Sequence, residues 1–446
     1  FNAANKAYQL TSFVGFRTFL QAVRGGKTID YEPFNPKAAR NLDSDDTDAE
    51  EEKPKRIMYV GPNEFEVKEI NADIGLNTEV KYVVLPEEKF AALVRRVTFT
   101  NTGSSALSLS ALDGLAQMEP VGGKLDWGLK QMGRTLEGWF GVYHADDTLT
   151  MPFYRMSTEP TDDAAVKIEE AGHYCISFIE DDENDAKLLP IVYDTSKVFG
   201  QSTSLDEAQG LKISTVSDLV SGPQFGDAKT SSAFAALDSF DLASGASVTI
   251  TSFYGRASHV DEVPKIASTV SKAGYASAKF ERARSLINEL TAGVETNTTS
   301  TLFDGAIKQM YLDNSLRGGM PHILGDVDEK ARMSNFDEDE RVKVFHAFSR
   351  IHGDLERDYN AFSIDDTYFS QGPGNYRDVA QNRREDVTLT PRIGAFNIKM
   401  FLSYIQADGY EPLTVEAVVY MMTDEEEVET IASAVTSDTN SSDTLV

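Results

Sequence analysis

Apolar and polar residues alternate along the middle of the chain, and this pattern predicts β-strands. The alternation is clearest in 97–100, 107–110 and 248–251. A period of two puts every second side chain on the same face, so each strand is predicted to have one buried and one solvent-exposed face. Asn101-Thr102-Gly103 supplies turn residues, so the first two strands are predicted to form a hairpin. Repeated strands between residues 56 and 261 predict a large antiparallel β-sandwich, with a helical insertion around Trp127 to Phe140.

The spacing becomes helical after about residue 262. Phe280, Ala283, Ile287 and Leu290 are spaced by three and four residues, which predicts one apolar stripe on a helix that begins near Pro264. Another apolar helix is predicted over Phe396 to Gln406. The predicted organisation is an N-terminal segment with an acidic linker (1–55), a β-sandwich (56–261), a helical linker (262–300) and a further helical domain (301–446). The fold class is therefore β plus α and multidomain.

Net charge excludes one class of partner. The 446 residues contain 42 Lys and Arg against 71 Asp and Glu, a formal charge of −29. Binding to phosphate backbones draws its affinity from Lys and Arg, so no nucleic-acid partner is expected. No apolar run approaches the length of a membrane span, so no membrane partner is expected either.

The single cysteine, Cys175, rules out an intrachain disulfide. It lies in the alternating segment 173–178, which predicts a buried and inert thiol; His173 is the only nearby candidate for an activating base.

Single-cysteine usage and the lack of a signal-peptide pattern lead us to expect a cytoplasmic protein. Because the sequence starts at Phe1, we expect it to be a piece of a longer chain.

The stretch from 351 to 387 is unusually rich in carboxylates, amides, arginines, aromatics and glycines. Buried polar groups of these kinds must be hydrogen-bonded, and sugar hydroxyls, which donate and accept at once, suit them. Asp378 accepting from two sugar hydroxyls, oriented by Arg377, would form such a site. The same two residues are also compatible with a salt bridge that only pins a loop.

Other candidate motifs are weaker. Asp365 and Asp366 are adjacent, but such pairs in loops usually face solvent. His346 and His352 do not have zinc-ligand spacing. We find no phosphate-loop or dinucleotide fingerprint, so no metal and no cofactor are expected.

The string Tyr376-Arg377-Asp378 followed by Gln381 resembles the substrate motif of cellobiose phosphorylases and their inverting relatives. The fuller pattern is closest to the large β-1,3-oligoglucan phosphorylases, with the β-1,2-oligoglucan enzymes as the alternative. Three further stretches agree with this resemblance: 353–384 around Gln371, Leu316-Arg317-Gly318-Gly319, and 404–413. The resemblance covers roughly residues 90 to 446 and is strongest over 311–413.

This resemblance implies an N-terminal β-sandwich, a helical linker and an (α/α)6 barrel, of which the chain would contain the first part. It implies that Asp378 binds hydroxyls of the sugar next to the broken bond, with Arg377 and Gln381 in the same network. Tyr376, Gln371 and Arg317 would complete the substrate-binding set. Cellobiose phosphorylases carry an arginine six residues before the motif aspartate, where this chain has Gly372.

The implied activity is inverting phosphorolysis of β-gluco-oligosaccharides, with inorganic phosphate as co-substrate and glucose 1-phosphate as product. The general acid in relatives lies far downstream, so it is expected beyond residue 446. A homodimer is also implied. Two other hypotheses stay open: a non-catalytic carbohydrate-binding protein, and a hydrolase with two carboxylates flanking the bond.

Overall fold

The structure is a computed structural model, and it describes residues 13, 15–35, 54–120, 131–145, 148–159, 164–181, 183–318, 320–324, 343–347, 374–384, 386–415 and 423–436. The acidic run at 43–52 and Gln371 lie outside these residues. The chain divides into two compact units, one within Tyr8–Glu295 and one whose described part begins at Thr296. The result is a mixed β and α protein with large antiparallel sheets and several helices.

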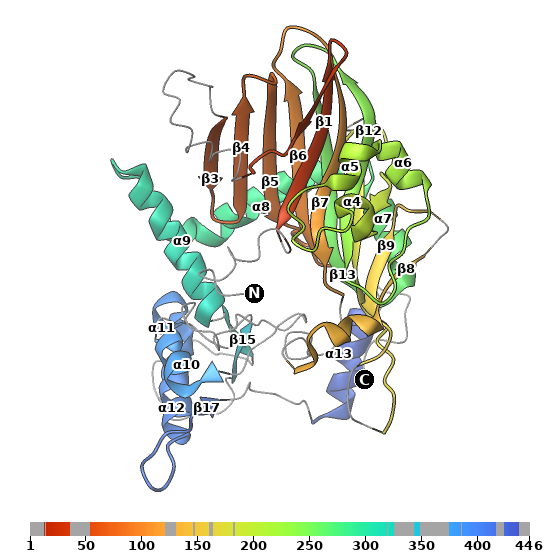
Figure 1. Cartoon of the computed structure of the whole chain (residues 1–446). Coiled ribbons are helices and arrows are strands. Elements are labelled where there is room, and N and C mark those ends of the chain that lie inside the picture. Colours follow the sequence, from red (N-terminus) through yellow and green to blue (C-terminus); the bar gives the residue numbers. More distant parts are fainter. Residues whose placement is uncertain are drawn as a thin grey trace. The chain divides into compact units, whose positions relative to one another are not determined.

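The first unit contains two antiparallel sheets packed face to face (Figure 1). The smaller sheet has the strand order β11 (Ile191–Val192), β12 (Ser231–Leu242), β7 (Leu107–Met118), β1 (Phe16–Arg24) and β2 (Lys27–Tyr31). The larger sheet has the order β3 (Lys55–Val60), β4 (Glu64–Asn71), β5 (Leu76–Val84), β6 (Ala92–Asn101), β13 (Ser247–Ala257), β10 (Gly172–Ile179), β9 (Pro152–Met156) and β8 (Phe140–His144). Strands β1 and β2 come from the predicted N-terminal segment, 1–55.

Helices pack on the outer faces of both sheets. Short helices α4 (Thr195–Phe199), α5 (Gln209–Ile213) and α6 (Val216–Ser221) pack on the smaller sheet through a buried apolar cluster. The 3-10 helix η4 (Val260–Glu262) leads into α7 (Val263–Val270), and α7 and α8 (Tyr275–Thr291) pack on the larger sheet. Because α7 and α8 pack against it from outside, β10 is buried on both sides rather than on one.

Two local predictions were wrong in an informative way. Strands β6 and β7 do not form a hairpin: β6 pairs with β5 and β13, whereas β7 pairs with β1 and β12 in the other sheet. Alternation sets which face of a strand is buried, but it does not choose the strand's partner. The helix predicted from Pro264 through Leu290 is two helices, α7 and α8, separated by a turn in which Gly274 has a φ of +68°.

The helical insertion predicted around Trp127 to Phe140 is present in its described part as the 3-10 helix η3 (Gly133–Trp139). Among the described residues, none of the helices has the length and apolar character needed to cross a bilayer.

A buried ion pair connects the two sheets. Arg95 on β6 and Asp113 on β7 have side chains that are 3% and 0% exposed. Arg95 Nη2 donates to Asp113 Oδ1 at 2.7 Å and its Nε donates to Oδ2 at 3.1 Å. Thr18 donates to the same carboxylate at 2.6 Å, and Tyr82 also contacts the guanidinium. The pair is therefore fully enclosed and well hydrogen-bonded.

The second unit is mainly helical in its described part. It contains a 3-10 helix, η7 (Pro391–Ile393), and five α-helices: α9 (Thr301–Gly318), α10 (Tyr376–Arg383), α11 (Asp386–Leu389), α12 (Phe396–Ser403) and α13 (Glu425–Thr436). Strands β14 (Met320–Leu324) and β15 (Lys343–Ala347) form one small sheet, and β16 (Gly374–Asn375) and β17 (Thr414–Val415) form another. Helix α12 confirms the helix predicted from Phe396 but ends at Ser403.

Candidate functional site

The Tyr376-Arg377-Asp378 string forms the first turn of helix α10. Tyr376 anchors this turn: its backbone N–H donates to Leu413 O at 3.2 Å, and its hydroxyl donates to Phe401 O at 2.9 Å. Its ring also packs edge-on against Phe401 and Tyr404, at centroid distances of 5.5 and 6.5 Å. These contacts fix where α10 begins, and therefore fix the positions of the motif residues that follow.

Arg377 and Gln381 lie four residues apart on α10, which places them on one side of the helix, and both are exposed. Asp378 is the third residue of α10, and Arg317 is near the end of α9, but their side chains lie outside the described part of the structure, as does Gln371. The sugar-binding roles of these residues remain predictions.

Stretches that are distant in sequence meet around this helix. Helix α9, which contains Arg317, packs against α10. Strand β16 leads directly into α10 and pairs with β17, where Gly374 lies opposite Val415. Tyr376 contacts Tyr404 and Leu413, the two ends of the 404–413 stretch. The motif string and the 404–413 stretch, which both carry the family resemblance, are therefore neighbours in space, and the helix that contains Arg317 packs against the motif helix.

A buried polar cluster lies at the other end of α10. His346 Nε2 and Asp386 Oδ2 are 2.6 Å apart, with side chains only 5% and 4% exposed. Asn397 donates to the same carboxylate oxygen at 2.7 Å and to the backbone carbonyl of Arg383 at 3.3 Å. Burial lowers the pKa of Arg383 to about 10, which still leaves it protonated at neutral pH. The cluster joins β15, α11 and α12 to the last turn of the motif helix.

The sequence did not predict this cluster, because His346 and Asp386 are 40 residues apart and neither belongs to a recognisable motif. Burial lowers the pKa of His346, although its bond to Asp386 acts in the opposite direction. A neutral imidazole donating from Nε2 to the carboxylate fits both effects.

Lowering the pH should loosen this part of the second unit. The pKa of His346 is near 6.5 in the unfolded chain and lower in the folded chain. At pH values between these two, the unfolded chain therefore binds more protons than the folded chain. The buried, neutral His346 therefore contributes its full stabilisation to the folded unit above about pH 6.5, and this stabilisation is lost as the pH falls below that value. We expect amide hydrogen exchange across α10 to α12, corrected for intrinsic rates, to lose protection between about pH 7.5 and 5.5.

The variant His346→Gln should flatten this pH dependence, while His259→Gln, at a half-exposed histidine of the first unit, should leave it unchanged. An unaltered profile in His346→Gln would assign the pH dependence to other groups.

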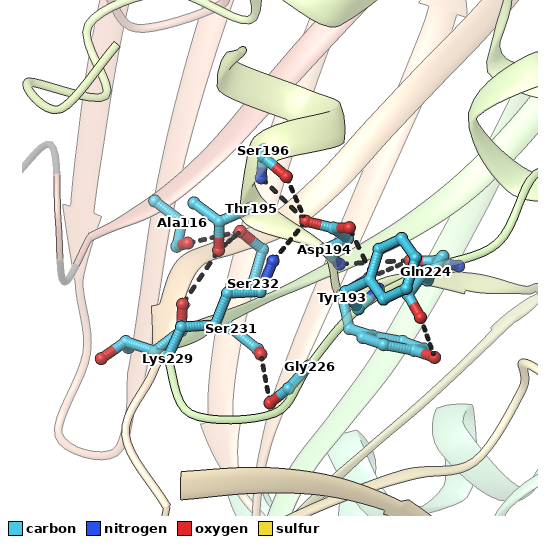
Figure 2. A network of polar contacts seen from close by, with 12 residues as sticks. Ala116, Tyr193, Asp194, Thr195, Ser196, Gln224, Gly226, Lys229, Ser231 and Ser232 are labelled. Atoms are coloured by element: carbon cyan, nitrogen blue, oxygen red, sulfur yellow. Dashed lines mark hydrogen bonds and ion pairs between the residues drawn. The ribbon is translucent and has the colours of Figure 1, made fainter. Parts of the chain in front are cut away.

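A second polar network lies in the first unit, between α4 and the loop before β12 (Figure 2). The Asp194 carboxylate accepts from Ser196 N and Oγ, from Phe225 N and from Lys229 Nζ at 2.6 Å. Burial alone would raise the pKa of Asp194, but these bonds hold it below its usual range. Thr195 Oγ1 donates to Thr230 O, and Ser232 Oγ donates to Ala116 O. Since the carboxylate is fully occupied by donors from its own chain, the network is an anchor for α4.

Cys175 confirms the prediction of an inert thiol. It is fully buried, and burial raises its pKa to about 12. Its Sγ lies 3.7 Å from Ser177 Oγ, whereas the ring of His173 hydrogen-bonds Glu119 O at 2.7 Å. His173 is therefore engaged elsewhere. The described residues contain no group of three or more His, Cys, Asp or Glu side chains that could hold a metal ion.

No family model and no curated protein matches the chain. Solved structures with partial similarity include a bacterial glucoamylase complexed with acarbose (9% identity, TM-score 0.36, covering 90% of this chain and 46% of that one). A family GH92 alpha-mannosidase from Bacteroides thetaiotaomicron matches at 11% identity and a TM-score of 0.28, covering 62% and 30%. A polysaccharide lyase matches at 11% identity and a TM-score of 0.27, covering 56% and 27%.

The chain thus spans less than half the length of each of these solved structures.

Proposed function

We propose that this chain belongs to an inverting β-glucan phosphorylase that acts on β-1,3-linked gluco-oligosaccharides. It would contribute the β-sandwich and the first part of an (α/α)6 barrel to a cytoplasmic homodimer. The substrates would be a β-gluco-oligosaccharide and inorganic phosphate, and the product glucose 1-phosphate.

One observation carries this proposal. The motif string 376–381 and the stretch 404–413 resemble the same enzyme family and contact each other in the second unit, and α9, the helix that contains Arg317, packs against the motif helix α10. A chance resemblance would scatter such stretches over the molecule, whereas a binding site requires them to converge. The clearest contacts between the two stretches are the hydrogen bond from Tyr376 N to Leu413 O and the edge-on packing of the Tyr376 ring against Tyr404.

The proposed reaction has one displacement step. A phosphate oxygen attacks the anomeric carbon, the bond from that carbon to the glycosidic oxygen breaks, and the departing oxygen takes a proton from a carboxylic acid. Phosphate is already anionic, so it needs no protein base, unlike the water of an inverting hydrolase. Asp378 would accept hydrogen bonds from hydroxyls of the sugar under attack, with Arg377 orienting it and Gln381 extending the network.

The test is an assay of the protein expressed with its native flanking sequence. We expect glucose 1-phosphate to be released from laminari-oligosaccharides only when inorganic phosphate is present. Faster reaction with sophoro-oligosaccharides would assign the β-1,2 linkage instead. Release of free sugar without phosphate would indicate a hydrolase, and binding with no turnover would indicate a carbohydrate-binding protein; either result overturns the proposal.

A further inference from the structure

The first unit has a notch on the larger sheet that the proposed function does not use. Its volume is about 240 Å³, and its walls include Arg96, Glu180, Phe240, Ser247 and Thr249. Pockets that hold drug-sized ligands run from roughly 300 to 1,000 Å³, so this notch is suited to a smaller group, about one sugar ring.

The notch exists because one strand stops early. The pairing of β10 with β13 ends at Ile179 opposite Ile250, and the last bond runs from Glu180 N to Thr249 O at 2.9 Å. Strand β13 nevertheless begins at Ser247. Because alternate residues direct their backbone groups to the same side, Ser247 presents its N–H and C=O toward the position that β10 has left. The floor of the notch is therefore an open strand edge.

An irregularity in the other sheet supplies an aromatic wall. The pairing of β12 with β7 shifts register between Leu237 and Phe240, and Ser239 within this bulge has a φ of +49°. Bulges re-aim the side chains that follow them. Here the bulge brings Phe240 to the edge of the sandwich core, where its ring is only partly buried and lines the notch.

The opposite wall is polar and held in place. Arg96 Nε donates to Glu180 Oε2 at 2.6 Å, and its Nη2 contacts Oε1 of the same carboxylate. Thr251 and Ser277 also donate to Glu180, at 2.8 and 2.9 Å, and the Arg96 guanidinium lies 5.2 Å from the Phe280 ring. These donors occupy the Glu180 carboxylate, so its part is to hold Arg96 in place. Because Glu180 also balances the charge of Arg96, the wall favours a neutral ligand over an ion.

We infer that this notch is a second carbohydrate-binding site, which takes one hexose unit of an oligosaccharide. An aromatic ring can cover the apolar face of a sugar, while the Arg96 guanidinium and the backbone groups of Ser247 can bind its hydroxyls. The Ser247 and Thr249 hydroxyls are paired with Thr100 and Thr98 and are not needed for this contact. Only the choice of a β-1,3-gluco-oligosaccharide as the ligand rests on the proposed function. The site itself lies in the first unit and contains none of the motif residues.

The experiment measures laminaripentaose binding by calorimetry to the protein expressed with its native flanking sequence and carrying Asp378→Asn, which weakens the proposed motif-helix site. Binding should persist in this background. Adding Phe240→Leu, which keeps apolar packing but removes the flat ring, should raise the dissociation constant about tenfold. The matched control is Phe225→Ala, at a phenylalanine of the same unit that is 67% exposed, and it should change nothing. Unchanged thermal unfolding of each variant verifies that the fold is retained.

The inference is overturned if no binding remains in the Asp378→Asn chain, or if Phe240→Leu binds as tightly as its parent. Neither result touches the proposed phosphorolysis, which is judged by glucose 1-phosphate release. Conversely, loss of binding in Phe240→Leu supports the notch even if the protein proves not to be a phosphorylase.

Discussion

Replacing Asp378 by asparagine should lower the rate of phosphorolysis by about a hundredfold to a thousandfold. The substitution keeps the size of the side chain and one acceptor, but it removes the charge that strengthens hydrogen bonds to the sugar. A preorganised charged contact that tightens in the transition state is worth about that much in rate. Initial rates of glucose 1-phosphate release, measured at saturating phosphate, give the effect directly.

The control for this prediction is Asp73→Asn, which removes an exposed carboxylate from a turn of the first unit. It should retain the parent rate. Gln381→Ala should have a smaller effect than Asp378→Asn, because an amide contributes neutral hydrogen bonds. An Asp378→Asn enzyme that keeps more than a tenth of the parent rate would show that the aspartate is only a loop or helix anchor.

The faces of the strands could be predicted from sequence, but their partners could not. Val97 and Phe99 on β6, and Leu107 and Leu109 on β7, are buried as their alternation predicts. The five residues that follow β6, however, cross from one sheet to the other instead of closing a hairpin. A short turn-forming segment is compatible with both connections, and the choice is made by packing across the sandwich core.

Of the candidate sites too, one could be recognised in the sequence and the others could not. The motif string on α10 is contiguous, so it could be recognised in the sequence, and its position at the start of a helix follows from one segment of chain. The His346–Asp386 pair and the Phe240 notch each combine side chains from several elements. The local spacing of these residues does not predict that they meet, because only the tertiary fold brings them together.

Replacing Arg95 by methionine should lower the free energy of unfolding of the first unit by about 3–5 kcal/mol. The change leaves the Asp113 carboxylate, which is 0% exposed, without its counter-charge between the two sheets. Thr18 alone cannot compensate for a buried charge, and removing one member of such a pair is much more costly than removing both. Both tryptophans of the chain, Trp127 and Trp139, fall within Tyr8–Glu295, so urea unfolding followed by tryptophan fluorescence reports this unit.

The double variant Arg95→Met, Asp113→Leu is the decisive comparison. It removes the charge together with its partner and fills the space with apolar groups, so it should recover most of the lost stability. Arg284→Met, at an exposed ion pair with Glu64, should change the free energy of unfolding by less than about 1 kcal/mol. If the double variant is no more stable than Arg95→Met, the loss comes from disturbed packing around Tyr82 and Thr18, and the ion pair is not what joins the two sheets.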